Sequence, residues 1–234
     1  ERRQMRAPGT ASKAGEADLI VLHPAMQRIL NTQRAWIDAG RVIAYRTALE
    51  LDVQKHHPDA TQREAAARWC SLVTPVLKSA WTEQAFAGGS ACLQVFGGHG
   101  FVREWGMEQL VRDCRIAPIY EGPNGNQALD LLGRKVLGSQ GKLLMGFTKL
   151  VHKLCQEHAE HPQLKAQVAQ LAALNKQWGE LTQKVGMAAM KNPDEVGAAA
   201  VDYLMFSGYI TLGYFWLRMA LVAQQKLEAG NGEA

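Results

Sequence analysis

The sequence predicts an all-α protein of antiparallel helices packed in bundles. Apolar residues recur at steps of three and four along most of the chain, which is the period of an amphipathic helix. No segment of useful length alternates with the two-residue period of a strand. The chain has 234 residues and a hydrophobic content of 47%, which is enough for a folded core. Helical bundles are the architecture that this pattern favours.

The helices of the N-terminal half are delimited by proline, glycine and polar turns. Residues 1–21 show no period and are expected to form a loop or linker. A long helix is predicted over residues 22–55, with Pro24 in its first turn, where proline is tolerated. A second helix is predicted over residues 60–96. Pro75 is expected to kink or divide it, because proline removes an internal hydrogen bond.

Further helices fill the rest of the chain, with a possible domain boundary near residues 140–160. They are expected over residues 105–115, 124–137 and 142–158, from Pro162 to about Val185, and from Asn192 to about Leu227. Gly138 is expected to end the second of these helices, since glycine is common just past a helix end. The acidic pair that follows Pro193 suits the first turn of the last helix.

Charge and cysteine content exclude several classes of function. The formal net charge of +4 comes from 26 basic and 22 acidic residues, and the only dense basic cluster lies in residues 1–6. Nucleic-acid binding is therefore not predicted, because it calls for a basic stripe along an element. The four cysteines show no Cys-x-x-Cys spacing, so neither a disulfide framework nor a zinc site is indicated. The histidines show no metal-ligand spacing either, and a reducing compartment fits best.

One apolar run raises the question of a membrane. Residues 203–217 carry no charge, but a membrane span needs roughly 20 apolar residues, and Asp202 and Arg218 close the run earlier. A buried helix is the favoured interpretation, and association with a membrane surface is the alternative. The chain opens on Glu1 without a secretory signal, so we expect an upstream segment.

The sharpest candidate for chemistry is Glu121, which lies between Tyr120 and Gly122 just before a predicted helix. Taken alone, such a glutamate is most simply a solvated turn residue. The competing interpretation is a carboxylate placed at a rigid helix entry to accept a proton from a substrate.

The residues around Glu121 resemble the carboxy-terminal helical domain of the acyl-CoA dehydrogenases. The resemblance is carried, in order, by Gln94-Val95-Phe96-Gly97-Gly98-His99-Gly100, Arg112-Asp113, Arg115-Ile116, Ile119-Tyr120-Glu121-Gly122 and Gln127. Glu1-Arg2 and His23 are similar to the start of the same domain. The similarity thus covers residues 1–140 as one bundle, and residues 141–234 resemble an additional helical extension found in a bacterial-type branch.

The resemblance implies an FAD-dependent dehydrogenation of an acyl-CoA. In this family a base removes the proton next to the thioester carbonyl and a hydride passes from the adjacent carbon to flavin adenine dinucleotide (FAD), leaving a trans-2-enoyl-CoA. Glu121 would be that base, and its backbone N–H would bind the thioester carbonyl. Gly122 would let substrate and flavin approach the backbone closely. Ile119 and Tyr120 are expected to give Glu121 an apolar setting, which favours its role as a base.

The resemblance also implies a set of FAD contacts. Arg2 matches an arginine suited to the pyrophosphate. The segment Gln94, Val95, Phe96, Gly97 and Gly98 matches one that reaches a dinucleotide held by a neighbouring subunit, although Gly97 and Gly98 equally fit a plain helix end. Further contacts are implied for Pro123, Asn124 and Gly125.

Some motif positions depart from the family pattern or are open to a structural interpretation. Pro123 replaces a common threonine and brings neither a hydroxyl nor an N–H. Asn126 and Pro24 also depart from the pattern. A structural ion pair is the favoured interpretation of Arg112 and Asp113.

Partners and location follow from the same resemblance. It implies an acyl-CoA substrate, an electron-transfer flavoprotein as electron acceptor, and a homodimer or homotetramer, in a bacterial cytoplasm or, in a eukaryote, the mitochondrial matrix. The chain is expected to be an incomplete, inactive part of the enzyme, because the amino-terminal helical domain and the β-barrel domain of the family are absent from it. The competing hypothesis is a non-catalytic helical module for oligomerisation or partner binding. A peripheral membrane role for the last helix is the third.

Overall fold

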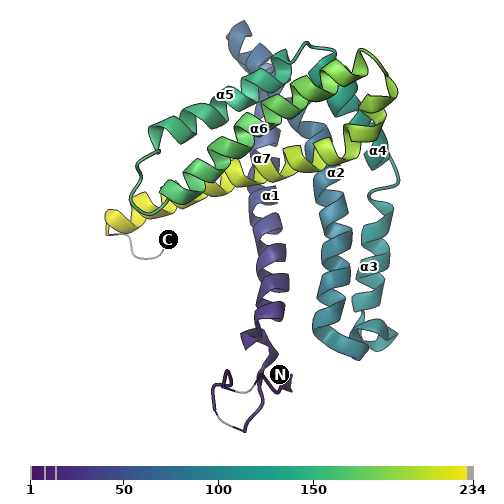
Figure 1. The fold of residues 1–234 in the computed structure, drawn as a ribbon, viewed down its shortest axis with the longest axis vertical. Coiled ribbons are helices and arrows are strands. Elements are labelled where there is room, and N and C mark those ends of the chain that lie inside the picture. Colours follow the sequence, from purple (N-terminus) through teal and green to yellow (C-terminus); the bar gives the residue numbers. More distant parts are fainter. Residues whose placement is uncertain (1, 8, 14, 231–234) are drawn as a thin grey trace. The chain divides into compact units, whose positions relative to one another are not determined.

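The structure is a computed structural model that describes residues 2–7, 9–13 and 15–230. Seven α-helices make up most of these ranges (Figure 1), which confirms the all-α prediction. They are α1 (Pro24–His56), α2 (Ala60–Phe96), α3 (Met107–Ile116), α4 (Asn124–Leu129), α5 (Lys142–Glu157), α6 (Lys165–Ala189) and α7 (Asp194–Glu228). Shorter 3₁₀ turns lie at η1 (Ile20–Leu22), η2 (Gly97–Phe101) and η3 (Arg103–Trp105).

The helix ends follow the predicted punctuation, and α1 begins at Pro24 as expected. Pro75 does not divide the helix, since α2 runs through this proline, and a kink there stays a prediction. Val73, Pro75 and Val76 are all buried, so packing around the proline offsets the backbone hydrogen bond that it removes.

The loop expected over residues 1–21 contains a short strand pair that the sequence pattern did not predict. Strand β1 (Arg3–Gln4) pairs antiparallel with β2 (Asp18–Leu19), and Arg3 lies opposite Leu19. Strands of this length are too short to show the two-residue period on which the prediction depends.

The helix expected over residues 124–137 is present but changes its winding. It starts as α4 and continues as a π-helical segment, η4 (Asp130–Leu137), which ends at Gly138 as predicted. Leu131, Leu132 and Val136 of η4 are completely buried. A π-helical stretch is rare and is found disproportionately near functional sites.

The described chain forms two compact units, each of which is considered by itself. One comprises residues 2–38 and 83–117, and the other residues 39–82 and 118–230. This grouping follows spatial proximity, and the division predicted near residue 140 stays a prediction. In the first unit α1 and α2 approach closely, since a side chain on Gly88 would collide with Gln33.

The second unit contains α5, α6 and α7 side by side (Figure 1), with an aromatic cluster in its core. Phe147 is at the centre of this cluster. Its ring centroid lies 5.5 Å from that of Trp69, 5.9 Å from Trp178 and 5.5 Å from Tyr214. Edge-to-face pairs at such distances add to the free energy gained from burial alone.

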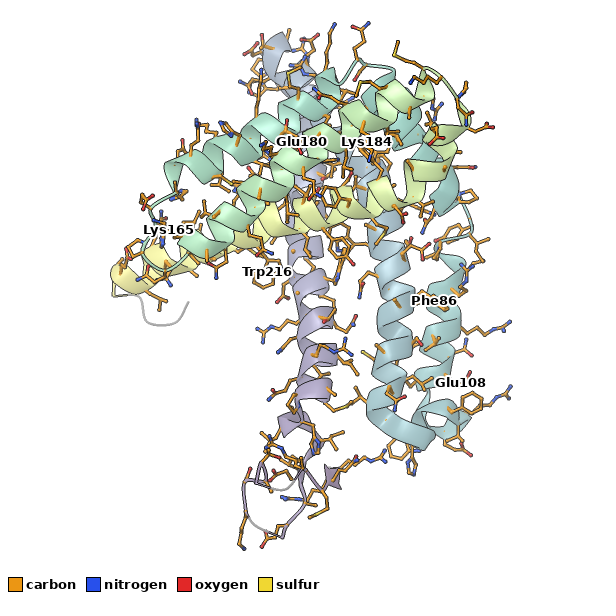
Figure 2. All side chains as sticks on the ribbon, in the orientation of Figure 1. Phe86, Glu108, Lys165, Glu180, Lys184 and Trp216 are labelled. Carbon is orange, nitrogen blue, oxygen red and sulfur yellow. The ribbon has the colours of Figure 1, made fainter. Side chains whose placement is uncertain are left out.

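Helix α6 shows how the sequence pattern builds this core. Val168, Leu171 and Trp178 are buried at steps of three and seven, which places them on one face of the helix. Glu180 and Lys184 are exposed (Figure 2). The helix is therefore amphipathic, as its three- and four-residue steps predict.

Helix α7 carries the apolar run for which a membrane role was considered. By length and composition it is apolar enough to cross a membrane, a property that it shares with core helices of soluble proteins. Leu204, Ile210 and Phe215 are buried within the second unit. This burial supports the favoured interpretation of the run as a core helix.

Tyr203 on α7 is expected to make the second unit less stable as the pH rises into the alkaline range. Its hydroxyl shares a 2.7 Å hydrogen bond with Thr182 Oγ1, and burial raises the pKa of Tyr203 to about 12. An unfolded tyrosine ionises near pH 10, so between about pH 10 and 12 the unfolded state loses a proton that the folded state keeps. We expect the free energy of unfolding to fall by about 2–3 kcal/mol across this window. Urea titrations at several pH values measure this fall.

The matched control is Tyr203→Phe, which keeps the ring and removes the titrating hydroxyl. Its stability is expected to be lower at neutral pH, because Thr182 keeps its bond to the Trp178 carbonyl but loses the one to Tyr203, and less dependent on pH above 10. An equal alkaline loss in both proteins would assign the effect to another group.

Candidate functional site

Glu121 lies at the tip of a loop that precedes α4. The backbone N–H of Asn124 donates to the carbonyl of Pro118 at 3.0 Å and closes the loop at its base. Glu121 and Gly122 both have left-handed backbone, with φ of 48° and 80°. A non-glycine residue in this region carries strain of order 1 kcal/mol, and such residues cluster at functional sites. The candidate base is therefore held in a costly conformation.

Gly122 is required by the fold itself. Besides its positive φ, a side chain at this position would collide with Gln127 Nε2, which donates to the Gly122 carbonyl at 3.5 Å. The side chain that occupies this space, Gln127, thus belongs to this chain. That Gly122 also lets the substrate come close to the backbone stays a prediction from the resemblance.

The expected apolar setting of Glu121 is not provided by the described residues. Glu121 is exposed, and so are Ile119 and Tyr120, at 48% and 52%. The physical reason is that side chains in a short turn diverge into solvent and do not cover one another. The Glu121 carboxylate is consequently accessible to a substrate from outside this unit.

Asn124, one of the predicted FAD contacts, is bound by α2. Its Oδ1 accepts from Lys78 Nζ at 2.8 Å, and its Nδ2 donates to Thr82 Oγ1 at 3.0 Å and to the Ser79 carbonyl at 3.4 Å. The Ser79 hydroxyl donates to the Asn124 carbonyl at 3.3 Å. The side chain thus has its hydrogen-bonding groups occupied within the chain, whereas its neighbours Pro123 and Gly125 are exposed.

A second group of predicted residues meets in the first unit, at the C-terminal end of α2. Arg2 Nη1 donates to the Phe96 carbonyl at 2.9 Å. Gly97 follows with a φ of 61°, and a side chain there would collide with the same guanidinium. Gly97 therefore ends the helix and leaves room for Arg2, so both interpretations of this glycine involve the same contact.

Two cavities adjoin Arg2. One of about 520 Å³ is lined by Arg2, Val95, Phe96, His99 and Trp105. Another of about 230 Å³ is also lined by Gln94 and Gly97. The structure thus brings together Arg2 and the segment 94–97, while the exposed Gly98 lines neither cavity; the FAD contacts that the resemblance implies for these residues stay a prediction.

Trp105 also lies at this place although no motif included it, and His99 belonged to the motif without an assigned role. The Trp105 ring centroid lies 6.3 Å from that of Phe96 and 5.2 Å from that of His99, so the three rings wall the larger cavity. Trp105 is 55% exposed. The available signal was the position of Trp105 just before Gly106, in a turn with no helical period.

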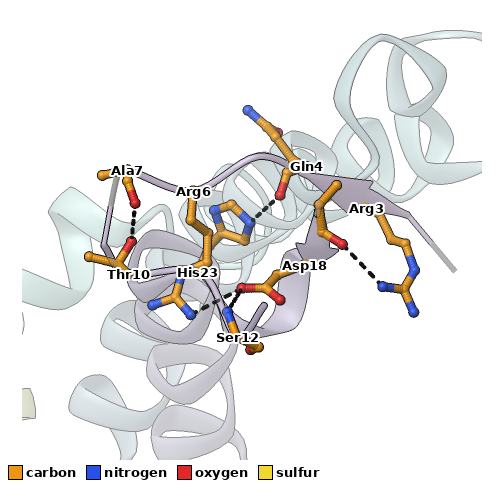
Figure 3. Close-up of polar contacts among 9 residues, drawn as sticks. Arg3, Gln4, Arg6, Ala7, Thr10, Ser12, Asp18 and His23 are labelled. Carbon is orange, nitrogen blue, oxygen red and sulfur yellow. Dashed lines mark hydrogen bonds and ion pairs between the residues drawn. The ribbon is translucent and has the colours of Figure 1, made fainter. Parts of the chain in front are cut away.

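The N-terminal loop holds Arg2 in position. Figure 3 shows polar contacts among other residues of this loop. The Arg2 carbonyl accepts from the backbone N–H of Ile20 at 3.1 Å. The Asp18 carboxylate accepts from the Ser12 N–H at 2.9 Å and pairs with Arg6 at 3.4 Å. The hydrogen bond from the Ser12 N–H lowers the pKa of Asp18, and Arg6 lowers it by a smaller amount. These contacts order a loop that would otherwise leave Arg2 free to move.

The favoured ion pair of Arg112 with Asp113 is wrong within the described residues. Asp113 accepts a hydrogen bond from Gln109 Nε2 at 2.7 Å, and no ion pair joins it to Arg112. Adjacent residues on a helix point in different directions, whereas residues four apart meet.

No group of three or more metal-ligating side chains gathers in the part of the chain that the structure describes.

Comparison with known proteins identifies the family. The model of the acyl-CoA dehydrogenase C-terminal domain matches residues 11–137, and one described as acetyl-CoA dehydrogenase C-terminal like matches residues 147–234. The chain belongs to the acyl-CoA dehydrogenase C-terminal domain family. It is homologous to flavin-dependent acyl-CoA dehydrogenases, a family that generally uses FAD.

Two curated relatives align with nearly the whole chain. The 3-methylmercaptopropionyl-CoA dehydrogenase of Ruegeria pomeroyi is 33% identical over 93% of this chain and 37% of its own length. A broad-specificity linear acyl-CoA dehydrogenase of Mycobacterium tuberculosis is 33% identical over 90% of this chain and 36% of its own. The chain therefore spans little more than a third of these relatives.

A solved structure supports the fold. The crystal structure of Caenorhabditis elegans ACDH-11 in complex with C11-CoA matches with a TM-score of 0.71 and 24% identity, over 83% of this chain and 32% of that protein. At 24% identity this similarity supports the helical fold alone.

Proposed function

We propose that the protein containing this chain oxidises acyl-CoA thioesters to trans-2-enoyl-CoA with FAD, and that Glu121 removes the α-proton. The observation that carries the proposal is the backbone of Glu121, left-handed at the tip of a loop whose base is closed by Asn124. The family match around this loop supports it. Strained backbone at a carboxylate of this motif is what a preorganised base calls for.

The chemistry assigns two tasks to Glu121. Its carboxylate accepts the proton from the carbon next to the thioester carbonyl, and its exposure leaves it open to that carbon. Its backbone N–H donates to the thioester oxygen, where negative charge develops as the proton leaves. FAD, when bound, accepts the hydride from the adjacent carbon.

The residues around Arg2 fit a bound dinucleotide. The guanidinium uses Nη1 for Phe96 and presents its other N–H donors beside the 520 Å³ cavity, and donors of this fork geometry suit a pyrophosphate. The missing side chain of Gly97 leaves room for this guanidinium. We propose that Arg2 and Gln94–Gly98 hold FAD, with Pro123 and Gly125 as further contacts that the resemblance implies; the side chain of Asn124, for which the resemblance implies the same role, is instead engaged by α2.

Partners and location belong to the same proposal. The caffeyl-CoA reductase–Etf complex subunit CarC of Acetobacterium woodii is 26% identical over 42% of this chain and 22% of its own, which supports electron-transfer flavoprotein as a partner, and we propose that this partner accepts the electrons. A homodimer or homotetramer in the cytoplasm, or in the mitochondrial matrix of a eukaryote, completes the proposal.

The test is the reduction of flavin by substrate in the full-length protein. We expect the purified protein to be yellow, to lose its visible flavin absorbance when butyryl-CoA or palmitoyl-CoA is added without oxygen, and to release a product lighter by two hydrogens. Mass spectrometry of the CoA ester measures the product. A protein that binds flavin but leaves it oxidised with every acyl-CoA offered would contradict the proposal.

One observation favours the assembly module as a second candidate. Tyr45 and Leu49 are 74% and 54% exposed and lie four residues apart, so they form neighbouring apolar side chains on one exposed face of α1. A module of this kind would self-associate without regard to added FAD, and Glu121→Gln would leave its function unchanged. Sedimentation with and without FAD separates the two candidates.

A further inference from the structure

The contacts of Asn124 make a mechanical connection between α2 and the loop of Glu121. Asn124 closes the base of the loop through its backbone N–H and is bound by α2 through its side chain and carbonyl. Its three partners, Lys78, Ser79 and Thr82, lie on adjacent turns of α2, which makes them neighbours on one face of the helix.

The charged and buried groups among Lys78, Ser79, Thr82 and Asn124 indicate that this cluster does more than pack α2 against the loop. Lys78 is half-buried, and its ammonium donates to a neutral amide and to no carboxylate among the described residues. Ser79 is 1% exposed, so its bonds to Asn124 are shielded from water. The bond from the charged Lys78 is stronger than a neutral one, and the bonds of Ser79 gain strength from their shielding.

We propose that Lys78, Asn124 and Thr82 are positioning residues that set the placement of Glu121 for proton transfer. None of them has to touch the substrate. They fix one end of the loop whose tip holds the carboxylate and the N–H that the reaction uses, and an error of about 1 Å in such a position can cost on the order of 10² in rate. This inference rests on the proposed role of Glu121.

The first test removes the link. In the full-length enzyme, Asn124→Ala is expected to lower kcat by roughly 10- to 100-fold, with KM and flavin content nearly unchanged. Asn126→Ala is the matched control, because Asn126 is an exposed asparagine of the same helix. A loss of flavin from Asn124→Ala without any change in kcat per bound flavin would overturn the proposal and favour the FAD contact predicted from the resemblance.

The second test asks whether the cluster acts as one unit. Thr82→Val removes the hydroxyl that accepts from Asn124 and should lower kcat, whereas Thr82→Ser keeps the hydroxyl and should retain most of it. If Lys78→Met and Asn124→Ala disrupt the same placement, the double variant should lose little more than Asn124→Ala alone. Independent, multiplicative losses would overturn the proposal.

A third measurement keeps the outcome separate from that of the proposed function. Amide exchange at Asn124, whose N–H is bonded to Pro118, should accelerate in Asn124→Ala and stay as in wild type in Asn126→Ala. A loosened loop with unchanged kcat would sink the positioning role, while an active Glu121→Gln variant would sink the proposed base.

Discussion

Replacing Glu121 by glutamine is expected to lower turnover by about 10²–10⁴-fold, the usual contribution of a general base. Glutamine keeps the length and shape of the side chain, so the left-handed backbone at this position carries the same strain. It removes the proton acceptor alone. Flavin should therefore stay bound, and the loss should appear in kcat, measured as the rate of flavin reduction by acyl-CoA in a single turnover.

The matched control is Asp113→Asn, another carboxylate of the same sequence motif. Asparagine can still accept the 2.7 Å hydrogen bond from Gln109, so this variant should turn over nearly as fast as wild type. Near-normal flavin reduction by Glu121→Gln would move the base to another residue. A comparable loss in both variants would point to the fold of the motif and away from proton abstraction.

Replacing Phe147 by alanine is expected to lower the free energy of unfolding by about 3–5 kcal/mol. Phe147 is 4% exposed and contacts three other aromatic rings at the centre of the second unit. Alanine removes the burial of the ring, leaves a cavity, and ends these ring contacts, two of which are edge-to-face. This loss is a large part of the total stability of an ordinary domain.

Phe101→Ala serves as the control for residue type, because Phe101 is 77% exposed and its loss should change stability by no more than about 0.5 kcal/mol. Urea unfolding followed by circular dichroism measures both variants, and an unchanged slope shows that the midpoint reports stability. Equal effects of the two substitutions would mean that the aromatic cluster does not form the core of the second unit.

The helices could be predicted because their causes are local. The period of three and four in α6 and the proline that opens α1 are properties of neighbouring residues, and both act before any tertiary contact forms. The β1 and β2 pair and the π-helical winding of η4 were missed. The first needs a partner strand about 15 residues away in the sequence, and the second leaves the apolar pattern of a helix unchanged.

The candidate site was likewise predictable in part. Glu121, Gly122, Arg2 and the segment 94–98 were recognised because a motif keeps its residue types and order, and the roles of these residues remain predictions. The exposure of Glu121 and the engagement of Asn124 by Lys78 were not predictable from the motif. The first depends on the path of the turn, and the second on where α2 lies beside the loop.

By itself the sequence determined the all-α class, the main helices and the family resemblance, because periodicity, helix ends and motif order are written along the chain. The tertiary structure alone decided that Arg2 meets the end of α2 across 94 residues of sequence, and that Asn124 is held by α2 across more than 40. Such contacts depend on the packing of helices that are distant in sequence, and side-chain hydrogen bonds form only once that packing has brought donor and acceptor within about 3 Å.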